Sequence, residues 1–137
     1  MIPNAQIVYG ITNDKSLLEG DIISIYCGVV KNGFYGDHAY TFEVGEVAEE
    51  TKKLLKITKE SLYMGIREFK TGNRVGDVGY AIQHYCEKHG YGIVRELVGH
   101  GLGKEMHEDP EMPNYGHRGQ GKKFTEGNVA GSSTQLP

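Results

Sequence analysis

The sequence predicts a single α+β domain, and three patterns carry this prediction. Two strand-like segments flank a turn sequence, two segments with helical periodicity follow, and a further strand leads into a glycine-rich bend with two histidines. A chain of 137 residues is long enough for one domain with a hydrophobic core and too short for two. We expect the domain to cover residues 1–130 and the polar residues 131–137 to form a disordered tail.

A β-hairpin is predicted near the start of the chain. Residues 21–30 are rich in β-branched side chains, which favour strands, and residues 34–44 form the returning strand. The intervening Asn32-Gly33 pair readily takes the positive φ angles that a tight hairpin turn needs.

Two registers of this hairpin remain open, with the turn at Lys31–Asn32 or at Asn32–Gly33. Side chains alternate between the two faces of a strand. Both registers therefore place Tyr26 and Asp37 on one face and His38 on the other.

Two helices and a third strand are expected next. Apolar residues recur at helical spacing over residues 48–70 and again from Val75 to Cys86. A strand is predicted for residues 91–98. From Pro110 onward the periodicity is lost, so a loop is expected there.

Composition excludes several classes of protein. The net charge is −3 and the Lys and Arg residues are scattered, so no nucleic-acid-binding face is indicated. No apolar stretch is long enough for a membrane span and no targeting segment is visible, which favours a cytoplasmic location. Cys27 and Cys86 are not spaced like metal ligands, and we expect buried free thiols.

The glycine-rich bend at residues 98–110 is the strongest candidate for a functional site. His100 and His107 lie seven positions apart, and imidazoles serve metal ligation and proton transfer near neutral pH. Glycines at alternate positions allow close approach to the backbone. The pattern matches neither a dinucleotide fingerprint nor a phosphate loop nor the zinc-protease helix motif. Taken singly, each histidine is also compatible with a hydrogen-bonded loop residue, and Asp37 with a solvated strand residue.

These segments together carry a specific resemblance. Six segments resemble those of bacterial type I methionine aminopeptidases. They are the hairpin sequences at 19–25, 32–37 and 40–42, the run around His100 at 96–103, and residues 106–110 and 113–116. The match extends from about residue 4 to residue 129. It covers the middle part of a full-length family member, so we expect a truncated or degenerate copy.

The resemblance implies a partial pita-bread (creatinase/aminopeptidase) fold, with an antiparallel sheet and two flanking helices. It also implies a metal-dependent hydrolase that removes the N-terminal methionine from new proteins, acting on N-terminal Met peptides or nascent chains. In this family two divalent metals (Co, Mn, Fe or Zn) are held by two Asp, one His and two Glu, and they activate a bridging water.

The resemblance assigns roles to five positions. Asp37 matches the second Asp ligand and His100 matches the His ligand of the metals. His107 matches the catalytic histidine that contacts the substrate, and Met106 falls on the wall of the methionine pocket. Tyr9 stands where the family has a histidine that positions the substrate.

Three of the five metal ligands of the family are missing from this chain. Tyr26 occupies the position of the first Asp, and a phenol with a pKa of about 10 is a poor replacement for a carboxylate. Residues 130–134 replace the strand that should carry the first Glu, and the second Glu lies beyond the match. Two divalent cations beside a single carboxylate would leave about three positive charges uncompensated. We therefore expect a metalloaminopeptidase by family that is inactive as an isolated chain.

Two alternatives stay open beside this interpretation. The chain could be a non-catalytic peptide- or protein-binding module of the same fold, or one part of a split enzyme in which another chain supplies the glutamates. Missing strands would expose a sheet edge and an apolar face, so we also expect marginal stability or association with itself or a partner.

Overall fold

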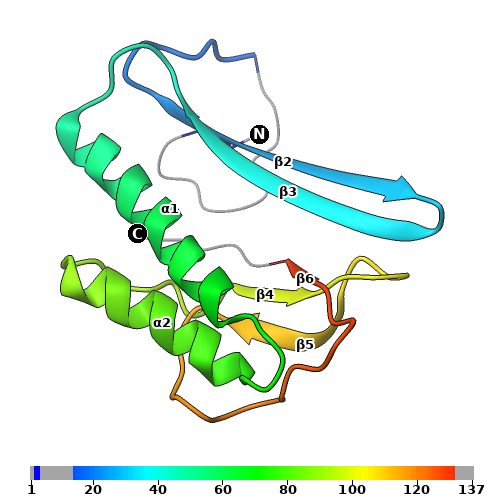
Figure 1. The fold of residues 1–137 in the computed structure, drawn as a ribbon. Helices are drawn as coiled ribbons and strands as arrows, with labels where there is room; N and C mark the ends of the chain where they lie inside the picture. The colour runs from blue at the N-terminus through cyan, green and yellow to red at the C-terminus, as the bar shows by residue number, and fades with distance from the viewer. Residues whose placement is uncertain (1, 4–13, 132–137) are drawn as a thin grey trace.

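The computed structural model describes residues 2–3 and 14–131. The elements in chain order are β1 (Ile2–Pro3), β2 (Ile22–Lys31), β3 (Phe34–Glu43), α1 (Glu49–Glu68), α2 (Val75–Lys88), β4 (Val98–Gly101), β5 (Glu108–Pro113) and β6 (Ala130–Gly131). The α+β class and both helices are confirmed. The described strands form two antiparallel sheets, ordered β1-β2-β3 and β5-β4-β6, where one sheet was expected (Figure 1).

The β2–β3 hairpin takes the register of the Asn32–Gly33 turn. Asn32 has a φ of 54° and Gly33 a φ of 78°, as a two-residue turn between twisted antiparallel strands requires. Lys31 pairs with Phe34 across the turn. The alternative turn at Lys31–Asn32 is therefore wrong.

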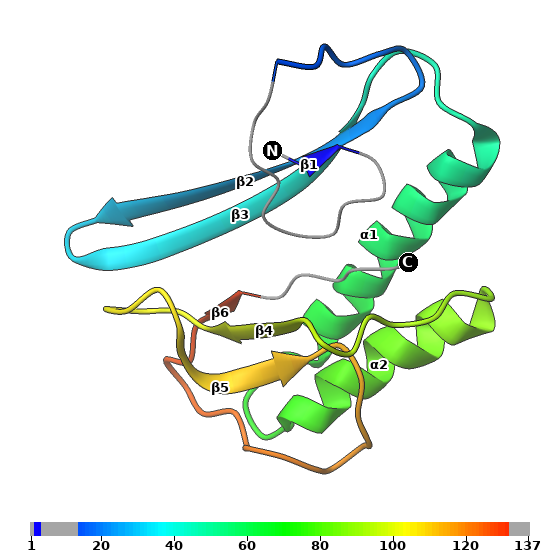
Figure 2. The ribbon, with the colours of Figure 1, turned by 180° about the vertical axis from the view of Figure 1, so that it is seen from behind.

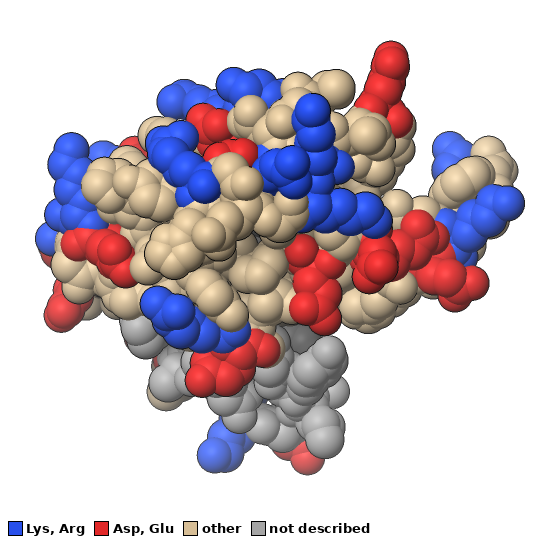
Figure 3. Space-filling model, turned by 90° about the horizontal axis from the view of Figure 1, so that it is seen from below, with Lys and Arg blue, Asp and Glu red and all other residues tan. Residues whose placement is uncertain are grey.

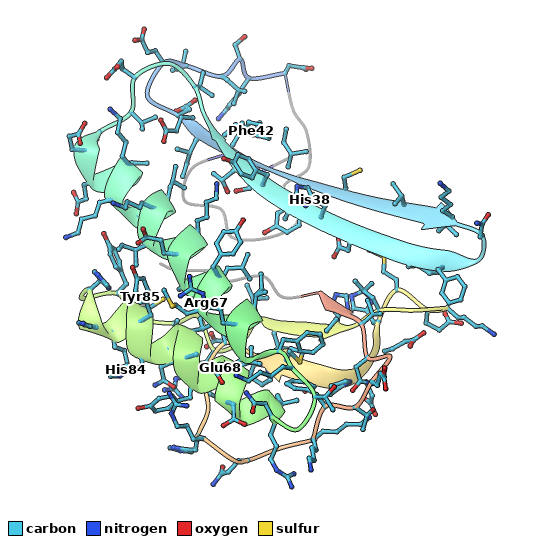
Figure 4. All side chains as sticks on the ribbon, viewed as in Figure 1. His38, Phe42, Arg67, Glu68, His84 and Tyr85 are labelled. Carbon is cyan, nitrogen blue, oxygen red and sulfur yellow. The ribbon has the colours of Figure 1, made fainter. Side chains whose placement is uncertain are left out.

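The two helices lie side by side and are linked across their interface. The Tyr85 hydroxyl on α2 donates a hydrogen bond of 2.6 Å to the Glu60 carboxylate on α1, and Figure 4 shows Tyr85 between the helices. This hydrogen bond raises the pKa of Tyr85 above its usual value. The predicted helix boundaries agree with the observed ones to within a few residues.

The hydrophobic core lies between α2, β5 and the segment that approaches β6. Its buried residues are Val75, Val78, Ile82, Cys86, Met112 and Phe124. The Phe69 ring meets the Phe124 ring edge to face, with 4.6 Å between centroids, and so links the end of α1 to this core. The core therefore supports the helices and the β5-β4-β6 sheet.

The β2–β3 hairpin is mostly exposed by comparison. Val30 is 60% exposed, Phe34 55% and Phe42 48%. The hairpin extends beyond the helices when the molecule is seen from the front and from behind (Figures 1 and 2). A two-stranded hairpin is marginally stable without further packing. The described part of the chain thus exposes apolar side chains on the hairpin, as expected.

The third strand differs from its prediction. Residues 91–97 are not strand; β4 begins at Val98 and contains His100 itself. The expected loop after Pro110 also begins within a strand, β5. A Cβ on Gly101 would lie 2.5 Å from the Asp109 carbonyl oxygen, so glycine lets β4 lie close against β5. Gly101 therefore serves strand packing, and the predicted bend lies in the segment 103–107 between β4 and β5.

Cysteine burial was predicted correctly for one residue of two. Cys86 is buried, and burial raises the pKa of its thiol. Cys27 is exposed, contrary to expectation, because it lies on the exposed part of the hairpin.

The distribution of charged side chains and the hydropathy of the two helices agree with the expectations from composition. Figure 3 shows side chains of both signs interspersed on the face seen from below. Among the described residues, neither helix is long and apolar enough to cross a membrane. Gly131, where the predicted tail begins, belongs to β6 and pairs with His100 of β4. Residues 132–137 lie outside the described residues.

The N-terminus of α2 is held by one carboxylate. Asp77 accepts a 2.8 Å hydrogen bond from the Arg74 backbone N–H and another from the Gly119 backbone N–H. The bond from Gly119, followed by that from Arg74, lowers the pKa of Asp77 below its ordinary value of 3.8.

We expect Asp77→Ala to lower the free energy of unfolding by about 1 kcal/mol, as for the loss of a helix cap. Because the folded pKa is lowered, this contribution is complete well above pH 3.8 and is lost as the pH falls through the folded pKa. Urea unfolding at pH 7 and pH 3 measures it. Asp14→Ala, at an exposed position, is the matched control. A difference from wild type that is as large at pH 3 as at pH 7 would contradict this role.

We expect Gly101→Ala to destabilise the chain by about 1–3 kcal/mol, because the new methyl group meets the backbone of β5. Gly103→Ala is the matched control. Its methyl group would meet the Glu108 carboxylate at 2.7 Å, and this flexible side chain can move away. Thermal unfolding of both variants tests the difference, and a loss in Gly101→Ala no larger than that in Gly103→Ala would contradict this packing of β4 against β5.

Candidate functional site

A cavity of about 1220 Å³ separates the β2–β3 hairpin from α1 and from the β5-β4-β6 sheet. Its walls include Tyr26, Asp37, His100, Met106 and His107. Four of these are sequence-predicted site residues, and Tyr26 is the residue at the lost ligand position. The fold therefore gathers residues that are up to 81 positions apart in the chain around one cavity.

The hairpin register determines how Asp37 and Tyr26 are presented. Asp37 pairs with Gly28, and Tyr26 pairs with Ala39. Directly opposite residues share a face, so Asp37 and Tyr26 are diagonal neighbours on the same face. His38, labelled in Figure 4, pairs with Cys27 and belongs to the other face, as predicted.

His100 is oriented by its own strand. Its Nδ1 atom lies 3.0 Å from the carbonyl oxygen of Gly101. A carbonyl only accepts hydrogen bonds, so this contact places the proton on Nδ1 and leaves Nε2 unprotonated in the neutral ring. An unprotonated Nε2 can ligate a metal, and a hydrogen bond from the other nitrogen is the usual way to orient such a ligand.

The segment after β4 folds back so that the two histidines meet. The ring centroids of His100 and His107 are 4.2 Å apart and the ring planes are tilted by 43°. His100 is half-buried whereas His107 is exposed. Two imidazoles thus share one side of the cavity, one held by the strand and the other open to solvent.

Met106 lies against the hairpin. A Cβ atom on Gly28 would be 3.3 Å from the methyl carbon of Met106, so glycine leaves the room that this thioether occupies. Sequence reasoning missed Gly28. The available signal was a glycine inside a strand of β-branched residues, which often marks a close approach.

Two contacts hold the segment that carries His107. The Tyr35 N–H on β3 donates a 2.8 Å hydrogen bond to the Gly103 carbonyl, which ties this segment to the hairpin. The Glu108 carboxylate accepts a 2.8 Å hydrogen bond from the Glu105 N–H. Glu108 was not predicted, because nothing in the sequence indicates which backbone group its carboxylate would accept from.

The donor set does not fit a two-metal centre. Over residues 2–3 and 14–131, no group of three or more His, Cys, Asp or Glu side chains is placed to hold a metal ion. Asp37 and His100 line the same cavity but provide one carboxylate and one imidazole. Even a catalytic zinc ion normally takes three protein ligands. Tyr9 lies outside the described residues.

The chain that forms this cavity is similar to proteins of one known family. Residues 2–134 match metallopeptidase family M24. The chain is 52% identical over 127 residues to a methionine aminopeptidase of Clostridium acetobutylicum, covering 92% of this chain and 51% of that protein. It is 45% identical over 126 residues to methionine aminopeptidase 1 of Bacillus subtilis, with the same coverages. The chain thus spans about half the length of the curated relatives it matches.

Solved structures agree with the sequence relatives. The methionine aminopeptidase of Rickettsia prowazekii superposes with a TM-score of 0.83 at 43% identity, over 85% of this chain and 47% of that one. The prolidase of Pyrococcus furiosus gives a TM-score of 0.75 at 26% identity, over 86% and 34%. These neighbours confirm the partial pita-bread fold. The chain belongs to metallopeptidase family M24 and is similar to bacterial methionine aminopeptidases.

Proposed function

We propose that this chain forms one wall of a methionine aminopeptidase site, and that the 137-residue polypeptide does not remove N-terminal methionine by itself. The observation that carries the proposal is the placement of the His100–His107 pair and the Asp37 carboxylate around one cavity. The relatives of this chain are named methionine aminopeptidases, which supports the proposed removal of N-terminal methionine. The cytoplasmic location expected from the sequence stays part of this proposal.

Each residue then has a specific role in a completed site. Asp37 and the Nε2 atom of His100 would be metal ligands, and carboxylate with imidazole suits Mn, Fe, Co or Zn. His107, exposed beside His100, would contact the substrate. Met106 would form part of the pocket for the methionine side chain, because its thioether lies against the hairpin at Gly28.

The activity is expected to be absent because charge and ligand number are insufficient. Asp37 supplies a single carboxylate, and Tyr26 beside it carries a phenol in place of a second one. The remaining ligands would have to come from polypeptide outside the described residues. In a completed site the metal supplies the activated water of the hydrolysis.

A second candidate is a module that binds N-terminal Met peptides without cleaving them. One observation favours it. Met106 and His107 line the cavity together even though the metal ligands are too few. A pocket of this kind could retain affinity for methionine after the chemistry is lost.

One experiment separates these functions. The purified chain is incubated with a Met-Ala-Ser peptide and Co²⁺ or Mn²⁺, and we expect no release of methionine above the protein-free control. Calorimetric titration of the same peptide without metal then tests binding. If the pocket binds, His107→Ala and Met106→Ala should each weaken binding, because they remove its lining.

The matched control is His84→Ala, because His84 lies on the outer side of α2 and does not line the cavity (Figure 4). Methionine release that is abolished by His107→Ala but not by His84→Ala would contradict the claim of inactivity. Binding without release would favour the second candidate.

A further inference from the structure

Within residues 2–3 and 14–131, two edge strands border the cavity. Among the described residues, β3 is the last strand of the β1-β2-β3 sheet and β6 is the last strand of the other sheet. Residues of both strands line the same cavity. Figures 1 and 2 show the hairpin facing β4 and β6 across this space, and the Tyr35 N–H on β3 donates to Gly103 in the segment after β4.

The hydrogen bond of Tyr35 shows which backbone groups of β3 point into this space. The Tyr35 N–H donates to Gly103 and so points away from β2. In an antiparallel pair the direction of the backbone groups alternates along the strand. The N–H and C=O groups of Asp37, Ala39 and Thr41 therefore also point away from β2 and form an edge of about 10–14 Å that no described strand pairs with.

We propose that this β3 edge binds an extended acidic peptide segment, which adds to the sheet as a further antiparallel or parallel strand. Such strand addition uses the backbone for affinity and alternate side chains for specificity. The inference deepens the proposed function, since the added strand would close the cavity of the incomplete site. It needs neither metal nor a free N-terminal methionine.

The lysines on the cavity wall favour acidic side chains in the bound peptide segment. Lys52, Lys56 and Lys59 line the cavity from α1. The lining carboxylates Asp37 and Glu43 belong to the other face of β3, opposite to Tyr40. Lys52 is already paired with Glu46 and Glu49. The Lys59 ammonium lies 5.5 Å from the centre of the Tyr40 ring, on the face of β3 opposite to Asp37. A strand beside β3 would place every second side chain on this face, so acidic residues there would meet the lysines of α1.

A second copy of the chain is a poorer occupant of the same edge. Because outward-pointing residues must pair with one another, antiparallel pairing of two β3 strands near their centres sets Asp37 opposite Ala39 or opposite Thr41 of the other copy. The first register makes the two Asp37 carboxylates diagonal neighbours. The second register does the same for Asp37 and Glu43. Like charges at these positions are unfavourable, and the copy would bring no acidic side chain to Lys56.

The probe is an N-acetylated, fluorescein-labelled heptapeptide of alternating valine and glutamate. Its binding to the full 137-residue chain is followed by fluorescence anisotropy without metal. We expect saturable binding to wild type. A peptide with lysine in place of glutamate should bind about tenfold more weakly or worse, because it would face the lysines of α1.

Ala39→Pro tests the edge itself. It removes one outward-pointing N–H and leaves the bonds between β2 and β3 in place, so binding should weaken about tenfold while the circular dichroism spectrum is retained. Val30→Pro is the matched control. Val30 pairs with Tyr35, so its N–H points away from β3 on the far side of the hairpin, and binding should be unchanged. The double variant Lys56→Glu, Lys59→Glu should lose affinity for the acidic peptide only.

Absence of saturable binding by folded wild-type chain would overturn the proposal. So would equal binding of the two peptides, or an equal loss in Ala39→Pro and Val30→Pro. A dimer in sedimentation velocity that Ala39→Pro dissociates, without any peptide binding, would replace the peptide with a second copy. Because the probe is acetylated and metal is absent, none of these failures bears on methionine binding or release.

Discussion

The positive φ angles of Asn32 and Gly33 set the register of the β2–β3 ladder, on which the rest of the cavity depends. With this register Asp37 lies opposite Gly28, and Met106 can reach the hairpin where Gly28 has no side chain. The same register turns the N–H of Tyr35 outward to Gly103, which fixes the segment bearing His107. A slip of one residue in one strand would move its side chains to the opposite face and separate Asp37 from the histidines.

The two halves of the molecule are stabilised unequally. The β5-β4-β6 sheet rests on the core around Ile82 and Met112, whereas the hairpin exposes large apolar side chains such as Val30 and Phe34. The half with the buried core carries His100, and the exposed half carries Asp37. The geometry of a site built across these halves therefore depends on how the hairpin is packed, since Asp37 is an exposed residue of β3.

Elements specified by local signals were predictable. The Asn-Gly turn, the β-branched run of β2 and the helical periodicity of α1 and α2 each act over a few residues, and all four elements were placed nearly correctly. β4 and β5 were misplaced because glycine, histidine, glutamate and proline do not favour strands. Their strand state comes from close pairing between Gly101 and the backbone near Asp109. Likewise the site residues Asp37, His100 and His107 could be named from the resemblance, but the Gly28–Met106 contact depends on residues 78 positions apart.

We propose that Asp37 and His100 are two ligands of one metal site, which Tyr26 leaves incomplete. Paramagnetic broadening of backbone amide signals by substoichiometric Mn²⁺ tests it most directly, in wild type and in Tyr26→Asp. We expect weak broadening around Asp37 and His100 together, and stronger broadening at the same two places in Tyr26→Asp, because a third ligand is added on the same face. Broadening near only one of these residues, or no change in Tyr26→Asp while the variant remains folded, would contradict the claim.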